Sequence, residues 1–406
     1  MEQIAKPHCG ARLDRLPDCR WHTSMFAMVA FGLLVCWSNA VGGLILAQLK
    51  ELGWTDNSTT ATFSAITTAG MFLGALGGGI IGDKIGRKNA FILYEAIHII
   101  SMIVGAFSPN MTFLIACRFV MGVGLGALLV TLFAGFTEYM PGRNRGTWSS
   151  RVSFIGNWSY PLCSLIAMGL TPLISAEWNW RVQLLIPAVL SLIATVIAWR
   201  SFPESPRWLE SRGRYQEAEK VMRAIEEGVI RQTGRPLPPV VIDDDGKQPC
   251  SVPYSALLTG VLLKRVILGS FVLIAMNVVQ YTLINWLPTI FMTQGINLKD
   301  SIVLNTMSMF GAPFGIFIAM LVMDKIPRKT MGVGLLVLIA VLGYIYSLQT
   351  SMLLITLIGF FLITFVYMYV CYASAVYVPE IWPTEAKLRG SGLANAVGRI
   401  SGIRSE

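Results

Sequence analysis

Long apolar stretches with very few charged side chains constrain this chain more than any other feature of its sequence. A helix needs roughly 20 apolar residues to cross a bilayer. Ten stretches reach or approach that length, at residues 25–49, 61–82, 89–107, 111–137, 152–174, 182–199, 266–292, 301–323, 330–348 and 351–378, and an eleventh begins at Gly390. Lipid offers the backbone no hydrogen-bond partner, so each stretch is expected to be helical.

The composition supports a membrane protein. Of the 406 residues, 54% are hydrophobic and 14% are charged, which is about half the charged share of a soluble domain. A single soluble core cannot bury so much apolar surface. These values exclude an ordinary cytosolic enzyme, a disordered tail and a disulfide scaffold, and they predict an all-α integral membrane protein.

The net charge of +9 indicates orientation in the membrane. Lysine and arginine are concentrated before the first stretch and in every second loop after it, whereas the alternate loops hold only Lys50, Arg181 and Lys299. Basic loops stay on the cytoplasmic side, so we expect a cytoplasmic N-terminus. A nucleic-acid-binding protein has its basic residues clustered on one face of a soluble domain. Here they lie in short loops between apolar stretches, so we expect no nucleic-acid partner.

The cysteines and histidines show no metal-ligand spacing and no disulfide framework. We therefore expect no metal and no cofactor. The leader has no cleavage pattern, so we expect no cleaved signal. The sequence contains no phosphate-binding loop, which argues against an ATP-driven pump, and a single intramembrane histidine argues against a membrane enzyme.

Two similar turns reveal an internal repeat. Residues 83–88 read Asp-Lys-Ile-Gly-Arg-Lys, and residues 324–329 read Asp-Lys-Ile-Pro-Arg-Lys, about 240 residues later. A second pair recurs at nearly the same offset, with Glu138 and Arg145 matching Glu380 and Arg389. Parallel repeats of this kind form transporters that bind their substrate between the halves, near mid-membrane.

The repeat predicts the domain organisation. It gives a cytoplasmic leader at 1–24, a six-helix bundle at 25–199, a cytoplasmic helical linker at 200–265 and a second bundle at 266–406. By this symmetry the second bundle is truncated after its fourth helix, which predicts about ten full spans and the start of an eleventh. We expect a truncated chain that is not fully active.

The repeated turns carry candidate gating residues. Asp83 lies at the C-terminus of its helix, where a carboxylate opposes the helix dipole and needs a partner. Arg87, Lys88 or a helix N-terminus of the other half can supply one. A contact between halves that forms only when the cytoplasmic side is closed would bias one conformation, and Asp324 repeats the arrangement.

Three intramembrane residues are further candidates. Arg118 lies in the fourth stretch, and a charged side chain inside a membrane is costly, so such a residue is expected to have a function. It can couple conformational changes or hold a substrate carboxylate. Glu95 and His98 lie one helical turn apart and can both titrate when buried. They are candidates for proton coupling, with a buried pair packed on a neighbouring helix as the alternative.

These motifs together resemble the major facilitator superfamily. Residues 82–88 resemble its turn between the second and third helices, and Arg118 with its spaced glycines resembles its fourth-helix motif. Residues 203–209, Pro-Glu-Ser-Pro-Arg-Trp-Leu, match the sugar-porter signature, and 379–384 match its counterpart in the second half. The resemblance implies two six-helix repeats and a gating role for Gly82, Gly86, Glu138, Arg145, Glu204, Arg207, Arg328, Glu380 and Arg389.

Within the superfamily the chain resembles the metabolite–proton symporter and sugar-porter-like group. Many relatives carry an acid in the first helix, but residues 25–49 contain none. Facilitated diffusion and proton coupling through Glu95 or Glu138 both stay open.

Amides and aromatic residues that interrupt apolar helices predict the solute site. Amides and phenols suit hydroxyl-rich solutes, and indoles can stack on sugar rings. For each residue an interhelical hydrogen bond or an interfacial position is the alternative interpretation. The candidates are Asn39, Asn157, Trp158, Gln280, Tyr281, Asn285, Asn305 and Tyr372.

The sequence thus predicts a monomeric, multi-pass secondary transporter in the inner (plasma) membrane. Its expected partners are the lipid bilayer, a small solute and, if coupled, protons. We expect a sugar, a polyol or a sugar-acid as solute, and the alternative is a small organic or aromatic carboxylate held by Arg118. A channel or a receptor is a further alternative, although a channel needs no paired cytoplasmic turns.

Overall fold

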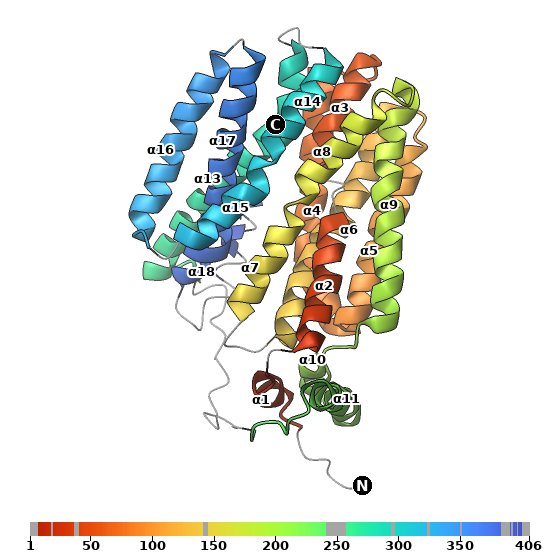
Figure 1. The fold of residues 1–406 in the computed structure, drawn as a ribbon, viewed down its shortest axis with the longest axis vertical. Helices are drawn as coiled ribbons and strands as arrows, with labels where there is room; N and C mark the ends of the chain where they lie inside the picture. The colour runs from red at the N-terminus through yellow and green to blue at the C-terminus, as the bar shows by residue number, and fades with distance from the viewer. Residues whose placement is uncertain are drawn as a thin grey trace.

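The computed structural model is helical throughout its regular structure (Figure 1). It describes residues 7–17, 19–35, 40–140, 145–240, 257–293, 297–322, 325–349, 351–382, 390, 393–395 and 397–399. Within this part of the chain, eight helices are long and apolar enough to cross a membrane: Ser58–Gly78, Arg87–Ala106, Met111–Leu132, Ala176–Ser201, Gly260–Leu283, Leu298–Val322, Arg328–Ser347 and Met352–Ser374.

Two groups of helices lie side by side (Figure 1). The first lobe comprises α2 (Arg20–Val35), α3 (Gly42–Glu51), α4 (Asn57–Ile85), α5 (Arg87–Ala106), α6 (Met111–Tyr139), α7 (Arg145–Gly156), α8 (Ser159–Leu170) and α9 (Ala176–Ser201). The second lobe comprises α13 (Gly260–Thr293), α14 (Leu298–Met309), α15 (Gly311–Val322), α16 (Arg328–Ser347), α17 (Met352–Cys371), the π-helix η2 (Tyr372–Tyr377) and α18 (Val378–Glu380).

Three helices lie beneath the first lobe (Figure 1). They are α1 (Cys9–Asp14), α10 (Pro206–Ser211) and α11 (Tyr215–Thr233). We call this end of the molecule the α11 end and the opposite end the far end. The C-terminal ends of α4 and α15 and the N-terminal ends of α5 and α16 all lie toward the α11 end (Figure 1), as the internal repeat predicts.

Glycines bring α4 and α6 into backbone contact. A methyl group added at Gly74 would collide with the carbonyl of Val123, and one at Gly126 would collide with the carbonyl of Met71. Small residues at such positions allow membrane helices to approach closely. The glycine spacing seen in the sequence therefore serves the packing of these two helices.

Four of the predicted helical stretches contain a local irregularity in the structure. The stretch 25–49 is divided between α2 and α3, and 152–174 between α7 and α8; the stretch 301–323 is divided between α14 and α15. The stretch 351–378 ends in a π-helical turn. The prediction that these stretches are helical is confirmed on both sides of each turn. The turns themselves were not predicted, because hydropathy measures apolar content and does not register a local turn.

Prolines explain two of the interruptions. Pro161 and Pro313 are each the third residue of the helix after a break, and neither has an N–H to bond the carbonyl four residues earlier. At the first break, the side chain of Asn157 donates to the carbonyl of Ser153 at 2.7 Å. The backbone N–H of Asn157 bonds the same carbonyl at 3.0 Å, so the helix ladder holds up to Asn157, and the donor that is missing is that of Pro161.

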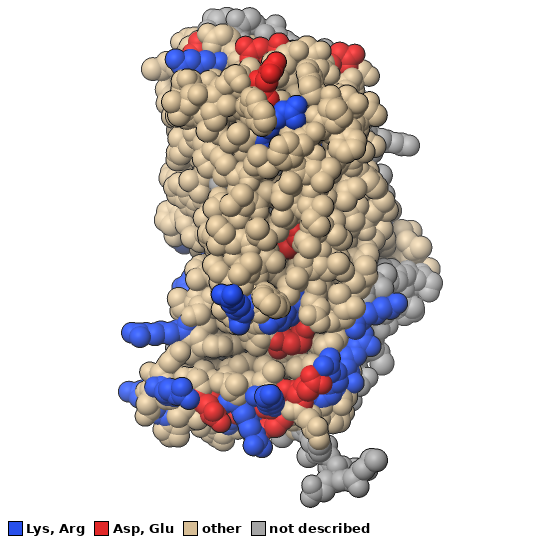
Figure 2. All heavy atoms as spheres, turned by 90° about the vertical axis from the view of Figure 1, so that its right-hand side faces the viewer, with Lys and Arg blue, Asp and Glu red and all other residues tan. Residues whose placement is uncertain are grey.

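The surface fits a membrane environment. Figure 2 shows one face with charged side chains gathered toward both ends and few in the broad band between them. Large apolar side chains such as Val189, Phe271 and Leu353 are exposed. A contiguous apolar surface of this size marks contact with lipid or with another protein.

Candidate functional site

One cavity of about 230 Å³ lies between the two lobes. Its wall combines apolar side chains with hydroxyls, amides, phenols and one guanidinium. The lining residues are Leu33, Met71, Leu125, Leu129, Ser153, Gly156, Asn157, Ser159, Tyr160, Gln280, Tyr281 and Arg399. Convergent polar groups set among apolar side chains are typical of small-molecule sites.

Three of the predicted solute residues meet in this cavity. Asn157 comes from the break between α7 and α8, whereas Gln280 and Tyr281 come from α13 of the second lobe. The ring of Tyr160 in α8 packs edge-on against Tyr367 of α17, with centroids 5.4 Å apart, and its phenol interacts with Gln280. Polar groups of both lobes therefore face one space.

Three other predicted solute residues lie outside the cavity lining. Trp158 is 37% exposed and packs against Phe310 with ring centroids 6.2 Å apart. Asn305 donates to the hydroxyl of Ser164 at 3.3 Å and so joins α14 to α8. For these residues the structure favours helix–helix contact, the alternative interpretation of the sequence.

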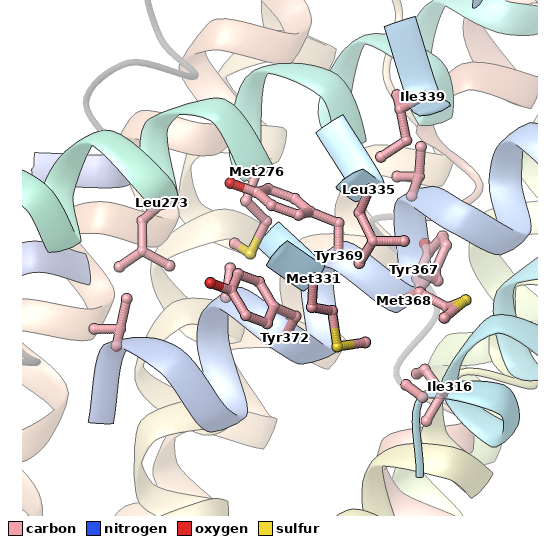
Figure 3. Close-up of a cluster of buried hydrophobic side chains, with 14 of the residues drawn as sticks. Leu273, Met276, Ile316, Met331, Leu335, Ile339, Tyr367, Met368, Tyr369 and Tyr372 are labelled. Atoms are coloured by element: carbon pink, nitrogen blue, oxygen red, sulfur yellow. The ribbon is translucent and has the colours of Figure 1, made fainter. Parts of the chain in front are cut away.

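Tyr372 also packs within its own lobe. Its ring stacks on Tyr377 with centroids 5.3 Å apart, and its hydroxyl occupies the space beside Gly332. Figure 3 shows Tyr372 next to Tyr369 and Met331 in the core of the second lobe. This position closes the core rather than facing the cavity.

Several predicted residues lie outside what the structure describes. These are Asn39, Asp324 and Arg389, together with the side chains of Asp83, Glu138, Arg145 and Asn285. The predicted contact of Asp83 or Asp324 with the opposite half stays a prediction.

Glu204 caps the N-terminus of α5. Its Oε1 accepts the backbone N–H of Arg87 at 2.8 Å and that of Lys88 at 3.2 Å. A carboxylate is favourable at a helix N-terminus, where N–H groups lack internal partners. Gly86 allows this approach: its φ is 100°, and a side chain there would meet the Glu204 carboxylate. Glu204 thereby fixes the segment before α10 to the turn that begins α5.

Three more predicted gating residues, Arg328, Glu380 and Arg207, form ion pairs. Arg328 binds Glu380 with two hydrogen bonds of 2.9 and 3.0 Å, which joins the start of α16 to α18 within the second lobe. Arg207 binds Asp14 at 3.0 Å, which joins α10 to α1. Gly82 is buried beside Ala90 and Thr131, where α4, α5 and α6 meet.

Arg118 is buried within the first lobe. Its guanidinium lies over the ring of Phe63, 4.6 Å from the centroid, and its Nη1 contacts the sulfur of Met121 at 3.4 Å. It is not among the described residues that line the cavity. The structure therefore does not place Arg118 against a solute in that cavity, which weakens the alternative in which it holds a carboxylate.

Glu95 and His98 form a buried pair, with Oε2 and Nδ1 3.6 Å apart. Both side chains are fully buried, and Gly124 of α6 packs against the backbone of His98. The predicted proximity is confirmed, but neither residue lines the described cavity. Any role of the pair in proton coupling stays a prediction.

The sequence interpretation missed a cluster at the α11 end, which we call the α1 cluster (α1, α10 and α11). Arg12 donates to Glu226 at 3.0 and 2.7 Å and also binds Glu219. Arg15 donates to Glu226 at 2.7 Å. Burial alone would raise the pKa of Glu226, but the hydrogen bonds from Arg12 and Arg15 outweigh it and lower that pKa.

The cluster also has an apolar core. Leu13 and Leu16 are fully buried against Trp208, Met222 and other residues of α10 and α11. The apolar stripe along α11 is visible in the sequence. That the leader before the first membrane helix packs on this stripe is not.

Comparison with known proteins identifies the family. The family model described as the Major Facilitator Superfamily matches residues 9–404. The chain belongs to this superfamily. It is 94% identical over 403 residues to YdjK of Escherichia coli K12, named as a proposed metabolite transport protein; the match covers 99% of this chain and 88% of YdjK.

One further relative agrees with this assignment, and a solved structure shares the fold. YdjE, named an inner membrane metabolite transport protein of Escherichia coli K12, is 43% identical over 97% of this chain and 87% of YdjE. The fold resembles the xylose transporter XylE of Escherichia coli in a partially occluded inward-open conformation, with a TM-score of 0.71 and 17% identity; the match covers 95% of this chain and 91% of XylE. The chain is thus a multi-pass membrane transporter of metabolites and not an enzyme.

Proposed function

We propose that this transporter moves a small polar metabolite, a sugar, polyol or sugar-acid, by alternating access around the cavity between the lobes. The single observation that carries the proposal is that Asn157 and Tyr160 of the first lobe face Gln280 and Tyr281 of the second across that cavity. Amides and phenols offer donors and acceptors that match hydroxyl groups.

The contacts between lobes support a moving arrangement. The described contacts at the far end are buried: Ile302 of α14 lies in one apolar cluster with Ile45 of α3 and with Val41, which precedes α3, and Asn305 bonds Ser164. Two packed lobes with a site between them can rock so that the site opens on one side at a time. We infer that the α11 end faces the cytoplasm, because its loops carry the excess of basic residues.

We propose the inner membrane as the location and a monomer as the working unit. The name of YdjE, which is a relative, specifies the inner membrane. Among other relatives, NiaP of Acinetobacter baylyi is named a niacin transporter and is 25% identical over 394 residues. This name supports the alternative solute class, a small organic or aromatic carboxylate.

Proton coupling is a second element of the proposal, with Glu95 and His98 as its candidates. The observation that favours it is their 3.6 Å contact in a fully buried position, where a proton shared by the pair would avoid an isolated charge. Uptake driven by an imposed pH gradient tests this element. Loss of gradient-driven uptake in Glu95→Gln, with exchange of solute retained, is the expected result.

Counterflow in proteoliposomes tests the transport proposal. Vesicles preloaded with an unlabelled sugar, polyol or sugar-acid should accumulate the same labelled compound transiently, and the initial rate should saturate with concentration. Linear flux without saturation would indicate a channel instead. Absence of counterflow for all three compound classes would contradict the proposed substrate range.

A further inference from the structure

The cavity between the lobes contains a cation that the sequence interpretation did not identify. Arg399 lines the cavity together with Asn157, Tyr160, Gln280 and Tyr281. Among the lining residues that the structure describes, it is the one with a formal charge at neutral pH. In the sequence it lies in the eleventh apolar stretch, close to where that stretch turns polar.

The backbone beside Arg399 is fixed against α13. Gly398 is so close to this helix that an added methyl group would lie 2.7 Å from Cβ of Leu273 and 3.1 Å from Nδ2 of Asn277. Leu273, Asn277 and Gln280 share one face of α13, since they are spaced four and three residues apart. The packing of Gly398 on this face therefore places Arg399 in the same part of the molecule as Gln280.

The charge of Arg399 is incompletely satisfied by the chain. Its Nη1 is buried and has no hydrogen-bond acceptor within the described residues. A buried donor without an acceptor is costly, and native proteins hold such groups where a ligand, an ion or water completes them. A guanidinium offers five donors in a planar fork that matches a carboxylate with two parallel hydrogen bonds.

We propose that the solute is a small monoanion, a carboxylate that also carries hydroxyl groups, and that Arg399 binds its carboxylate while Asn157, Tyr160 and Gln280 bind its hydroxyls. This inference rests on the proposed function and narrows its substrate class to the acid. It transfers the role of carboxylate partner from Arg118 to Arg399.

The charge and size of the site argue for a monoanion. A phosphate ester carries about −1.5 to −2 charges at neutral pH, whereas the described lining provides one cation. The cavity of about 230 Å³ is below the range of roughly 300–1,000 Å³ that holds drug-sized ligands. A compact sugar acid fits both the single positive charge and the volume of the cavity. The corresponding neutral sugar or polyol would leave Arg399 without a partner.

The test compares acids with neutral compounds of matched size. Gluconate and glucuronate are assayed beside glucose and sorbitol by counterflow in proteoliposomes, with binding followed by the shift in unfolding temperature. The wild-type protein, Arg399→Lys, Arg399→Gln and Arg214→Gln are compared. Arg214 is an exposed arginine at the α11 end and controls for the loss of a positive charge.

The proposal predicts saturable counterflow of an acid in the wild-type protein and in Arg214→Gln. Arg399→Gln should raise the acid's KM at least tenfold and abolish its thermal shift, and Arg399→Lys should retain part of both. Equal unfolding temperatures without solute establish that the variants fold. If Arg399→Gln does not fold, the comparison of Arg399→Lys with wild type decides: an unchanged acid KM overturns the inference.

The outcomes separate this inference from the proposed function. Saturable counterflow of glucose or sorbitol, with no response to either acid, overturns the anion inference and leaves the transporter proposal standing. Acid counterflow that is equal in wild type and Arg399→Gln also overturns the inference. Absence of counterflow for all four compounds in the wild-type protein contradicts the proposed function itself, and with it the inference.

Discussion

Arginines in two regions of this molecule have opposite surroundings. In the α1 cluster, Arg12 and Arg15 are bound by Glu226 and other acceptors of the same chain. In the central cavity, the described lining around Arg399 contains no carboxylate, and its buried Nη1 has no acceptor among the described residues. The difference separates two uses of the same side chain: the arginines of the cluster hold elements together, whereas the arginine of the cavity is available to something that is not part of the chain.

This contrast makes a general prediction for variants of the two regions. Changes in the α1 cluster should alter the docking of α1 and leave solute affinity unchanged. Changes in the cavity should alter solute affinity and leave α1 docked. A cavity variant that loosens α1, or a cluster variant that changes solute affinity, would contradict this comparison.

The largest effect is expected for Glu226→Ala. It removes the acceptor of Arg12 and Arg15, which are mostly buried, and breaking such a pair costs about 3 kcal/mol. Hydrogen exchange of the α1 amides should accelerate strongly, while the KM for solute stays constant. Glu227→Ala, an exposed neighbour, is the matched control. Equal exchange in the two variants would contradict the role of the pair.

A smaller effect is expected for Glu204→Ala. The variant loses the acceptor for the N–H groups of Arg87 and Lys88, and removal of a helix cap costs about 1–2 kcal/mol. Exchange of these two amides should accelerate, and Glu204→Gln should preserve part of the protection because its amide oxygen still accepts. Protection that is unchanged in Glu204→Ala would show that α5 begins without this cap.

In the cavity, Gln280→Ala should raise the KM for solute by about five- to tenfold, because one neutral hydrogen bond contributes about 1 kcal/mol. Exchange of the α1 amides should not change. Gln183→Ala is a suitable control, since Gln183 is a buried amide that bonds Asn179 within α9. A similar rise in KM in both variants would point to a general loss of structure.

Acidic pH should weaken the α1 cluster. Hydrogen bonds from the arginines hold the pKa values of Glu219 and Glu226 below normal, in spite of burial. The stabilisation is therefore complete above the unfolded pKa of about 4.3 and is lost as the pH falls through the lower folded values. Exchange of α1, corrected for its intrinsic pH dependence, should stay constant from pH 7 to 5; loosening within that window would contradict the assignment.

The smallest effect is expected for Arg214→Gln. Arg214 and Glu217 form an exposed ion pair with a 2.5 Å contact, and solvent screens such pairs strongly. Neither the exchange of α1 nor the KM should change measurably. A clear change in either would show that exposed charges at the α11 end act on the rest of the molecule.

The membrane helices are the part of this structure that the sequence predicts best. Apolar stretches without charges can only be helical in lipid, and the eight described spans fall on eight of the ten predicted stretches. The breaks within them were not predicted, although Pro161 and Pro313 were visible signals for two of them. Hydropathy averages over a whole segment, so a local loss of hydrogen bonds at one proline does not change it.

The candidate site was only partly predictable. Asn157, Gln280 and Tyr281 were found because polar residues in apolar helices are conspicuous. Arg399 was not, since its position beside α13 depends on the packing of Gly398, which is a contact more than 100 residues away in the chain. Asn305 and Tyr372 gave the same sequence signal as the cavity residues, and only the three-dimensional arrangement distinguishes them.

The central claim is that the solute binds in the cavity between the lobes, and protection of Ser153→Cys from alkylation tests it most directly. Ser153 lines the cavity, whereas Ser211→Cys at the exposed end of α10 serves as the control; both are made after replacing the native cysteines by serine. The account predicts that transported solute slows alkylation of Ser153→Cys, with half-protection near its KM, and leaves Ser211→Cys unaffected. Equal alkylation rates of Ser153→Cys with and without saturating solute would contradict it.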